Sequence, residues 1–499
     1  MAMAQREATV NKANKWLVLA LLSASLFMVV IDFSIIQIAL PAIENQFAVP
    51  LSQLQWIVTG YSLTYAGLLI LGGRVGDIYG RKKLFVSGLL LFSLASLSGG
   101  LAPSLGVLVI ARLVQGVGAA IGSATSMSII MEIFPEGRER NKALSIISAI
   151  LSSGFAAGVV VGGFMTAAFG WRSVLLVNVP IGIAASIAAI GYIPESTSVS
   201  AHKHLDIPGA VSLTAGLMLL VYALVVAESS GLFSAGTLTP LAMAFAILAV
   251  FIAIERRSGN PLVPLAFVRR NTVLGANSAG LIVSATMGGL IFIQTIFLQQ
   301  VLGYSPLVAG LMFLPEAFIF LITSGMLSEK LVRRFGAKSV MMAGVAIAVL
   351  GFAVLTTISI SGGYVYGLLP GMAVASTGCG LAWTAISIIA LEGARKGEEG
   401  LASGLFNTSI QVGGPIGLAL LLTVASTRSN AVSGAGSTAS LVAGFREAFA
   451  FAAGMAALAL AISAMMRSGG RKADIEAEKE LEIAAAPPTM SEGVIPHEE

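Results

Sequence analysis

The feature that most constrains this chain of 499 residues is a succession of long apolar runs that continues along almost its whole length. A run of about 18 or more apolar residues can cross the hydrocarbon core of a bilayer as one α-helix. A helix satisfies its own backbone hydrogen bonds inside lipid, whereas an open strand or loop leaves them unpaired. We therefore expect an all-α polytopic membrane protein.

With a span length of about 20 residues, the apolar runs predict about fourteen transmembrane helices. They lie near residues 16–40, 52–72, 84–102, 106–130, 143–168, 174–193, 208–228, 239–255, 272–300, 307–327, 339–360, 365–391, 402–426 and 445–466. The first run is too long for a signal-peptide core and lacks a small-residue cleavage site, so we expect it to remain as the first helix. The loops are mostly short and leave no room for a soluble catalytic domain.

The composition excludes several classes of protein. Charged residues make up only 11% of the chain, against about 25% in soluble domains. The single cysteine, Cys379, rules out an intrachain disulfide and a thiolate metal site. The sequence also contains no Gly-Lys-Ser/Thr phosphate loop, no cluster of metal-ligating residues and no Ser/His pairing. We therefore predict a protein that is not an enzyme, carries no metal or other cofactor and binds no nucleic acid.

Positive charges are unevenly distributed between the loops, and this asymmetry predicts the orientation. Alternate loops carry the basic clusters Arg81, Lys82 and Lys83; Arg138, Arg140 and Lys142; Arg256, Arg257, Arg269 and Arg270; Lys330, Arg333, Arg334 and Lys338; and Arg395 and Lys396. The opposite loops carry only Arg172, Arg428 and Arg446. Because basic loops stay in the cytoplasm, we expect a multi-pass protein of the cell membrane (inner or plasma membrane) with both termini cytoplasmic.

A faint internal repeat relates the two halves of the chain. The segment Gly73–Asp77 after the second predicted helix resembles Gly325–Glu329 after the tenth, and each precedes a basic cluster and a glycine, Gly80 or Gly336. Parallel repeats of this kind are typical of two-bundle membrane proteins. We expect an N-terminal six-helix bundle over residues 1–194, two linker helices over 195–270, a C-terminal six-helix bundle over 271–470 and a flexible cytoplasmic tail over 471–499.

Four motifs carry a resemblance to a known family. They are GRVGDIYGRKK (Gly73–Lys83), VVIDFSIIQIALP (Val29–Pro41), IARLVQGVGAA (Ile110–Ala120) and WRSVLLVNVPIG (Trp171–Gly182). Together with the number of predicted helices, they resemble the major facilitator superfamily and, within it, the fourteen-helix drug:proton antiporter branch. The resemblance implies the major facilitator fold: two six-helix bundles with two extra helices between them.

The resemblance also implies a conformational latch at the cytoplasmic ends of the bundles. Its residues here are Gly73, Asp77, Gly80 and Arg81. Glu132, just beyond the predicted helix 106–130, is a candidate partner for Arg81. A solvated acid at a helix end is an equally good interpretation of Glu132.

Asp32 and Arg112 are charged residues inside apolar spans, where an ionised side chain is costly unless it faces a partner or a wet cavity. Asp32 lies nine residues before Pro41, and Arg112 lies nine residues after Pro103. Each is therefore about 13 Å from the outer end of its helix, at ~1.5 Å per residue. The equal depth predicts that the two side chains meet. We expect them to serve proton coupling or substrate binding; a purely structural salt bridge is the alternative.

Glu316 is a third charge within the apolar spans. It lies near the middle of the span 307–327, directly after Pro315, and no Lys, Arg or His occurs in that span. Its carboxyl must therefore be protonated, paired with another helix or a substrate, or bathed in cavity water. We expect it to face a central cavity and to select cationic or proton-bearing substrates. A neutral, hydrogen-bonded acid in a helix interface is the alternative.

The fifth predicted helix carries four glycines, Gly154, Gly158, Gly162 and Gly163. The spacing of four places the first three on one face, which permits close contact with another helix. The pattern resembles the family's antiporter motif, but Val159 stands where the motif has proline.

Six further residues are polar or aromatic within apolar spans, and each is a candidate for lining a cavity or for hydrogen bonding between helices. They are Gln37, Gln294, Asn277, Asn407, Gln411 and Trp383.

These observations favour a proton-coupled secondary transporter that exports amphipathic drugs or toxic small molecules by alternating access, in contact with membrane lipids. Transport of a lipid or lipid-like metabolite is the second interpretation. The third, from another class, is a membrane sensor or scaffold that transports nothing. The sequence leaves the substrate, which is amphipathic and cationic or lipid-like, the proton stoichiometry and the oligomeric state open.

Overall fold

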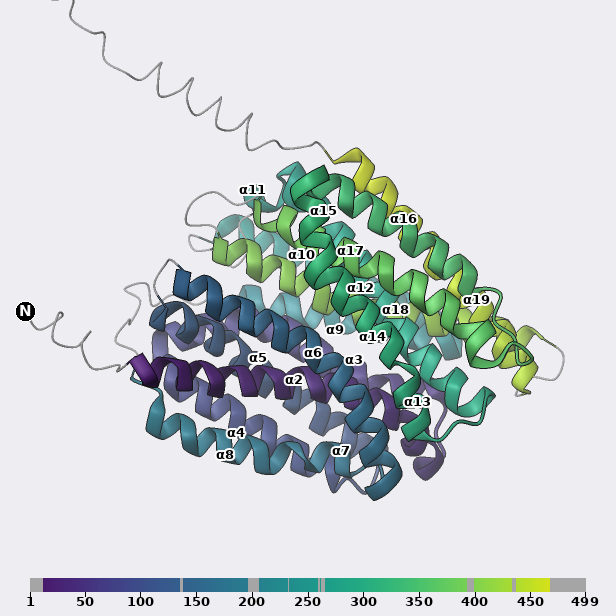
Figure 1. The fold of residues 1–499 in the computed structure, drawn as a ribbon, viewed down its shortest axis with the longest axis horizontal. Coiled ribbons are helices and arrows are strands. Elements are labelled where there is room, and N and C mark those ends of the chain that lie inside the picture. The colour runs from purple at the N-terminus through teal and green to yellow at the C-terminus, as the bar shows by residue number, and fades with distance from the viewer. Residues whose placement is uncertain are drawn as a thin grey trace, which may run out of the picture.

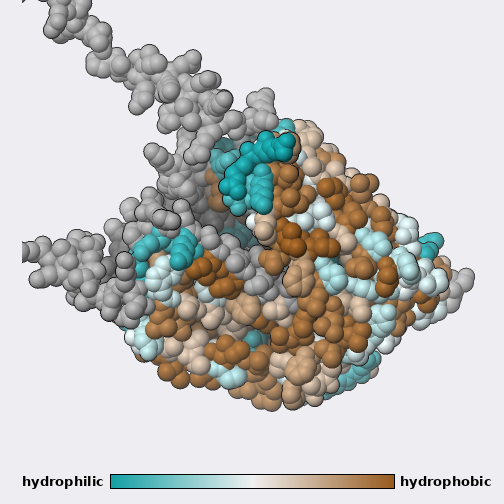
Figure 2. Space-filling view, viewed as in Figure 1, coloured by the Kyte–Doolittle hydropathy of each residue, from teal (hydrophilic) through white to brown (hydrophobic). Residues whose placement is uncertain are grey.

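The computed structural model describes residues 12–134, 138–195, 206–231, 233–258, 261, 265–392, 399–432 and 437–466. Within these ranges every regular element is a helix, and each of the fourteen predicted segments contains helical chain. Eleven helices of the described residues are long and apolar enough to cross a membrane. Apolar side chains cover most of the face shown in Figure 2, with hydrophilic patches toward its left and right sides. The chain is therefore a multi-pass helical membrane protein, and the predicted tail lies outside the described residues.

The helices form an N-terminal and a C-terminal group, which lie beside each other in Figure 1. The N-terminal group consists of α2 (Lys12–Phe47), α3 (Leu51–Tyr79), α4 (Arg81–Gly100), α5 (Leu105–Ile133), α6 (Arg138–Phe169), α7 (Ser173–Leu176) and α8 (Asn178–Tyr192). The C-terminal group consists of α12 (Asn271–Ile296), η1 (Phe297–Val301), α13 (Pro306–Met312), α14 (Leu314–Ile322), η2 (Thr323–Leu327), α15 (Ser328–Phe335), α16 (Ala337–Leu355), η3 (Gly363–Leu368), α17 (Leu369–Glu392), α18 (Glu399–Ala431) and α19 (Thr438–Met465).

Between the two groups the chain forms α9 (Ile207–Ser230), α10 (Ala235–Arg257) and the short α11 (Leu265–Val268). Helix α9 packs against α10 and also contacts α3 of the N-terminal group and α18 of the C-terminal group. The Thr214 hydroxyl donates to the carbonyl oxygen of Gly67 at 3.0 Å, and the Thr423 hydroxyl donates to that of Leu224 at 3.3 Å. Helix α9 therefore bridges the two groups along one side.

Proline explains where several predicted helices differ from the observed ones. The predicted span 307–327 is interrupted at Phe313 and continues into the π-helix η2. Since Pro315 has no N–H, it cannot donate to the carbonyl of Leu311. One helix therefore ends before it, and the next begins at Leu314. The predicted span 174–193 is likewise divided at Val177, three residues before Pro180. In contrast, α2 runs through Pro41 and ends at Phe47, seven residues beyond the predicted end at residue 40.

The expected cytoplasmic loop after the second helix is in fact a junction of a single residue. Helix α3 ends at Tyr79 and α4 begins at Arg81, with Gly80 between them at φ +102°. Gly336 occupies the same position between α15 and α16, at φ +83°. Residues with a Cβ rarely adopt such a conformation, which explains the glycine at both places. The repeat seen in the sequence thus corresponds to a repeated helix–glycine–helix junction.

Glycines allow α6 to approach α2 closely. A Cβ on Gly158 would lie 3.0 Å from the carbonyl oxygen of Ile31, and one on Gly162 would lie 2.8 Å from that of Ile35. Gly154, one turn earlier, faces the side chains of Phe27 and Val30 of α2. The common face predicted for these three glycines is therefore confirmed as a helix contact.

The two helix groups touch where α2 and α6 end, and we call this the end contact. Gln299 donates to the carbonyl oxygen of Ile38 at 2.9 Å, and Gln300 donates to the Glu44 carboxylate at 2.5 Å. A Cβ on Gly163 would lie 2.6 Å from the carbonyl oxygen of Pro306 on α13. Backbone therefore packs against backbone here, with no space for a further side-chain atom.

We predict that Gly163→Ala destabilises the protein by about 1–3 kcal/mol, because the added methyl would overpack the end contact. The measurement is thermal unfolding of the purified protein. Gly454→Ala is the matched control: Gly454 is exposed on α19 and a Cβ there would meet nothing within 4 Å. Equal melting temperatures for the two variants would contradict the close packing.

Candidate functional site

Asp32, on α2, is completely buried and accepts three hydrogen bonds. Its Oδ2 accepts from Nη1 of Arg112 at 2.6 Å. Its Oδ1 accepts from Nδ2 of Asn178 at 2.6 Å and from Nε2 of Gln115 at 2.8 Å. Three donors around two oxygens fit an ionised carboxylate, which only accepts hydrogen bonds. The predicted meeting of Asp32 and Arg112 is confirmed.

Arg112, on α5, is also completely buried. Its Nε donates to the carbonyl oxygen of Ile57 at 3.0 Å, and its Nη1 also donates to Gln115 at 2.7 Å. The guanidinium carbon lies 4.2 Å from the centroid of the Tyr61 ring, a distance typical of a cation–π contact. Within the described residues its Nη2 has no hydrogen-bond partner. The two N–H groups of Nη2 thus stay unused inside the N-terminal group.

Five helices contribute to this buried network, since Ile57 and Tyr61, the other partners of Arg112, belong to α3. Arg112 and Gln115 are three residues apart on α5 and therefore share a face. Asn178 is the first residue of α8, directly after the interruption at Val177. Ser96 of α4 accepts from Gln115 at 2.6 Å and from Asn178 at 3.2 Å. Any change in the charge of Asp32 consequently acts on the packing of α2, α5 and α8 together.

Glu316, on α14, stands apart in the C-terminal group. It is half-buried, and its Oε2 is buried without a hydrogen-bond partner in the described part of the chain. It forms no ion pair with any residue that the structure describes. Phe320 follows one turn later, and its ring centroid lies 6.2 Å from that of Trp383 on α17. The structure therefore places an unpaired carboxyl and two aromatic rings near the contact of α14 with α17.

Two of the six residues considered for a cavity lining serve contacts between helices. Asn277 donates to the carbonyl oxygen of Val273 at 2.7 Å and accepts from Ser409 at 3.0 Å, so it connects α12 to α18. Trp383 packs edge-on against Phe320, as described above.

The other four residues leave room for a role in binding. Gln37 on α2 and Gln294 on α12 are buried, and their side-chain nitrogens have no partner among the described residues. A buried polar group without a partner costs about 1–3 kcal/mol, which favours contact with water or substrate. Gln411 is half-buried on α18 and hydrogen-bonds to Tyr65 of α3, and Asn407 is exposed on the same helix. All four stay candidates.

The latch residues lie at the junction of α3 and α4. Arg81 pairs with Glu132 of α5 at 2.8 Å, so the partner suggested by the sequence is confirmed. A Cβ on Gly73 would be in ordinary contact with Ala124, at 3.7 Å. The side chain of Asp77 lies outside the described residues. Because Arg81 and Glu132 both belong to the N-terminal group, a latch that joins the two groups stays a prediction.

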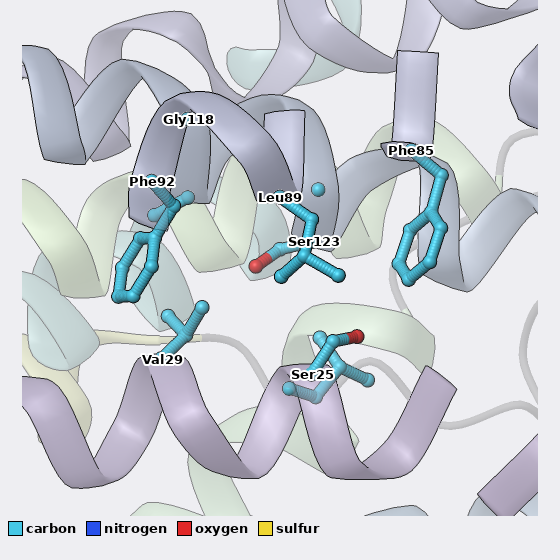
Figure 3. Close-up of a pocket in the computed structure, with 10 residues that line it drawn as sticks. Ser25, Val29, Phe85, Leu89, Phe92, Gly118 and Ser123 are labelled. Atoms are coloured by element: carbon cyan, nitrogen blue, oxygen red, sulfur yellow. The ribbon is translucent and has the colours of Figure 1, made fainter. Parts of the chain in front are cut away.

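A small void lies between α2, α4 and α5, and Figure 3 shows its lining. Its volume is about 10 Å³, at the lower limit for a single water. Val29, Leu89 and Phe92 contribute apolar walls, and Ser123 contributes a hydroxyl that has no partner among the described residues. A drug-sized ligand needs about 300 Å³ or more, so this void is no substrate site.

Sequence reasoning missed part of the network around Asp32. It singled out none of Asn178, Tyr61 and Ser96, all of which belong to this network. The available signal was weak, because a serine or an aromatic residue in an apolar span usually serves packing. Only Asn178, an amide in an otherwise apolar run, could have been singled out.

Spanning helices in two groups, with a charged pair buried inside one of them, are typical of membrane transporters. The chain belongs to the Major Facilitator Superfamily, whose family model matches residues 22–418. This match confirms the resemblance that the motifs carried.

Similar proteins include several exporters and resistance proteins. The cephamycin export protein CmcT of Amycolatopsis lactamdurans is 37% identical in sequence. The matched region covers 88% of this chain and 89% of CmcT. The multidrug resistance protein Stp of Mycobacterium tuberculosis is 35% identical in sequence, and the matched region covers 79% of this chain and 73% of Stp. A bacterial homologue of the human lysosomal transporter Spinster, in an inward-facing and occupied conformation, shares the fold at a TM-score of 0.65 and 16% identity. That likeness covers 91% of this chain and 97% of the other.

We predict that Asp32→Asn and Arg112→Gln each destabilise the protein by about 3–5 kcal/mol, since each leaves its buried partner uncompensated. The double variant should lose much less free energy of unfolding than the two single variants lose in sum. The measurement is a double-mutant cycle on thermal unfolding. The exposed Glu329–Arg333 pair, 3.4 Å apart, is the control, with effects of about 0.5 kcal/mol or less. Additive losses at Asp32 and Arg112 would show that the pair is not coupled.

Proposed function

We propose that this protein is a proton-coupled secondary transporter that exports amphipathic drugs or other toxic small molecules by alternating access. The similar proteins support the substrate class, because their names describe cephamycin export and multidrug resistance. The observation that carries the proposal is the completely buried Asp32–Arg112 pair, 2.6 Å apart. Charged residues inside spanning helices mark ion or substrate pathways, because burying them without a function is unfavourable.

In this proposal fourteen helices cross the cell membrane, and both termini are cytoplasmic. Residues 1–194 and 271–470 form the two bundles, residues 195–270 supply the linker helices and residues 471–499 form a tail. The basic clusters then lie inside, as the distribution of Lys and Arg requires. The end contact consequently lies at the outer face, and the beginnings of α2 and α6 lie at the cytoplasmic face.

Asp32 is the proposed site of proton binding. As a carboxylate it accepts hydrogen bonds from three side chains on α5 and α8. A proton on Asp32 turns one acceptor position into a donor and removes the charge that balances Arg112. The contact of α2 with α5 and α8 is then weakened. Proton binding therefore changes the relative stability of two arrangements of these helices, which is what coupling requires.

Glu316 is the proposed determinant of substrate charge. Its unpaired carboxyl and the nearby rings of Phe320 and Trp383 offer an anion and aromatic surface to the same ligand. Cations bind favourably both to a carboxylate and to the face of an aromatic ring. We therefore expect cationic amphipathic compounds to bind here, between α14 and α17.

The remaining motif residues fit supporting roles in the same cycle. Gly73, Asp77, Gly80 and Arg81 are the proposed latch at the cytoplasmic ends of the helices, with Glu132 holding Arg81. The glycine face of α6 is the proposed sliding surface, because it presents backbone rather than side chains to α2 and α13.

We predict that the double variant Asp32→Asn with Arg112→Gln remains folded but loses gradient-driven export. Removing both charges together avoids an uncompensated buried ion, so a loss of transport reports on coupling rather than on folding. The measurement is proton release from proteoliposomes on addition of puromycin, ethidium or another test compound. The signal should fall to that of empty vesicles.

Exchange of labelled for unlabelled compound across the same vesicles, without a gradient, should persist in the double variant. Glu195→Gln, an exposed acid after α8, serves as the control and should behave like the unchanged protein. Undiminished uphill transport by the double variant would remove Asp32 from the coupling mechanism.

We predict that Glu316→Gln weakens binding of cationic compounds by about tenfold or more, because a contact with a charged group contributes ~1.5–3 kcal/mol. Neutral analogues of the same shape should bind about as before. The measurement is an affinity series across matched cationic and neutral pairs at several pH values. Glu329→Gln, an exposed acid of the same region, is the control. Equal losses of affinity for the cationic and the neutral compound of each pair would mean that Glu316 has a structural role.

A further inference from the structure

A second, larger hollow lies between the beginnings of α2 and α6, on the surface of the N-terminal group. Its volume is about 430 Å³, and apolar side chains such as Leu19, Phe27 and Ile150 make up most of its lining. The small residues Ala20 and Ala24 are exposed along its floor. We call this hollow the α2–α6 groove. It is separate from the network around Asp32, which lies on the opposite side of α2 toward α5 and α8.

The α2–α6 groove contains a polar group without a partner. Ser23 lines it, is only 2% exposed, and has a hydroxyl that makes no hydrogen bond with any described residue. A well-packed helix contact would have paired this hydroxyl with a backbone carbonyl, as Ser25 does with Leu22 at 2.8 Å. The Ser23 hydroxyl is therefore left with a hydrogen-bond donor that the described residues do not use.

Positive charge gathers at the mouth of the groove. The Lys142 ammonium lies 5.2 Å from the ring centroid of Trp16, which is the first lining residue. Lys15 is next to Trp16 and pairs with Glu139 at 2.5 Å, while Arg140 donates to the carbonyl oxygen of Phe134 at 2.8 Å. Lys15, Arg140 and Lys142 thus bring positive charge to this end of the groove. Lys142 is exposed and forms no ion pair with any of them.

The length of the groove corresponds to one leaflet of a bilayer. From Trp16 to Phe27 the groove follows eleven residues of α2, or ~16 Å at 1.5 Å per residue. The hydrocarbon core is ~30 Å thick, so one leaflet contributes about half of that. Tryptophan beside lysine at one end is also the usual arrangement at the level of lipid headgroups.

We infer that the α2–α6 groove is a binding site for one anionic phospholipid. The phosphate contacts Lys142 beside Trp16, an acyl chain lies along Ala20 and Ala24, and Ser23 donates to a carbonyl oxygen of the ester linkage. Under the proposed orientation this lipid belongs to the cytoplasmic leaflet. The lipid would fill the space where α2 and α6 diverge and so hold the two helices in the arrangement described here.

The test uses the full-length protein with Cys379→Ala and a single fluorescent label on Ala20→Cys. It is reconstituted in phosphatidylcholine vesicles that contain brominated phosphatidylglycerol or, in parallel, brominated phosphatidylcholine as the quencher. We expect the anionic lipid to quench the label more strongly at equal mole fraction. Lys142→Gln should reduce this preference about fivefold, the factor that one lysine at a membrane surface contributes. Ala24→Leu, which fills the groove, should reduce quenching by both lipids.

Two matched controls separate the groove from the general surface. A label on Leu94→Cys, which is 59% exposed on α4, should be quenched equally by the two lipids. Lys83→Gln, an exposed lysine at the beginning of the same helix, should leave the preference at Ala20 unchanged. Equal quenching at Ala20 by both lipids, or a preference insensitive to Lys142→Gln, would overturn the inference. Neither outcome depends on transport, so the proposed function is tested separately.

Discussion

The carboxylate of Asp32 and the guanidinium of Arg112 are the charges that the interior of the N-terminal group has to accommodate. Both are completely buried, and neither can reach a headgroup, so each must find its partner inside the protein. Most other contacts of this region follow from that requirement. Gln115 and Asn178 complete the coordination of Asp32, and Ser96 in turn accepts from both amides. With the contacts of Arg112 to Ile57 and Tyr61 on α3, the network ties five helices to the charge state of one residue.

The contact of α2 with α6 differs between its two ends, and this difference suits a molecule that changes conformation. At the end contact Gly162 and Gly163 bring α6 against backbone of α2 and α13, which excludes any added atom. At the other end the same two helices diverge and leave the α2–α6 groove. A helix pair that meets backbone to backbone at one end, and through side chains such as Lys15 and Glu139 at the other, can shift along its glycine face. Bistable packing of this kind converts small local changes into larger movements.

The sequence predicted the parts of this structure that follow from one-dimensional rules. The length of apolar runs located the helices, and the equal depth of Asp32 and Arg112 predicted their pairing. It could not predict the single-residue junction at Gly80, because the basic cluster after it has the composition of a loop although it begins a helix. Nor could it identify Tyr61 as a partner of Arg112, since that contact depends on how α3 and α5 are rotated.

Val159 stands where the antiporter motif has proline, and the backbone around it shows what this difference changes in α6. Val159 is buried, and α6 continues through it without interruption from Arg138 to Phe169. A Cβ on Gly310 of α13 would lie 2.7 Å from the carbonyl oxygen of Val159, so valine already allows backbone contact between the two groups. A proline at this position would remove one N–H, and its ring would clash with the carbonyl of Phe155 and bend α6. With valine at position 159, α6 stays unbroken, and Gly158, Gly162 and Gly163 meet α2 and α13 without the bend that a proline would add.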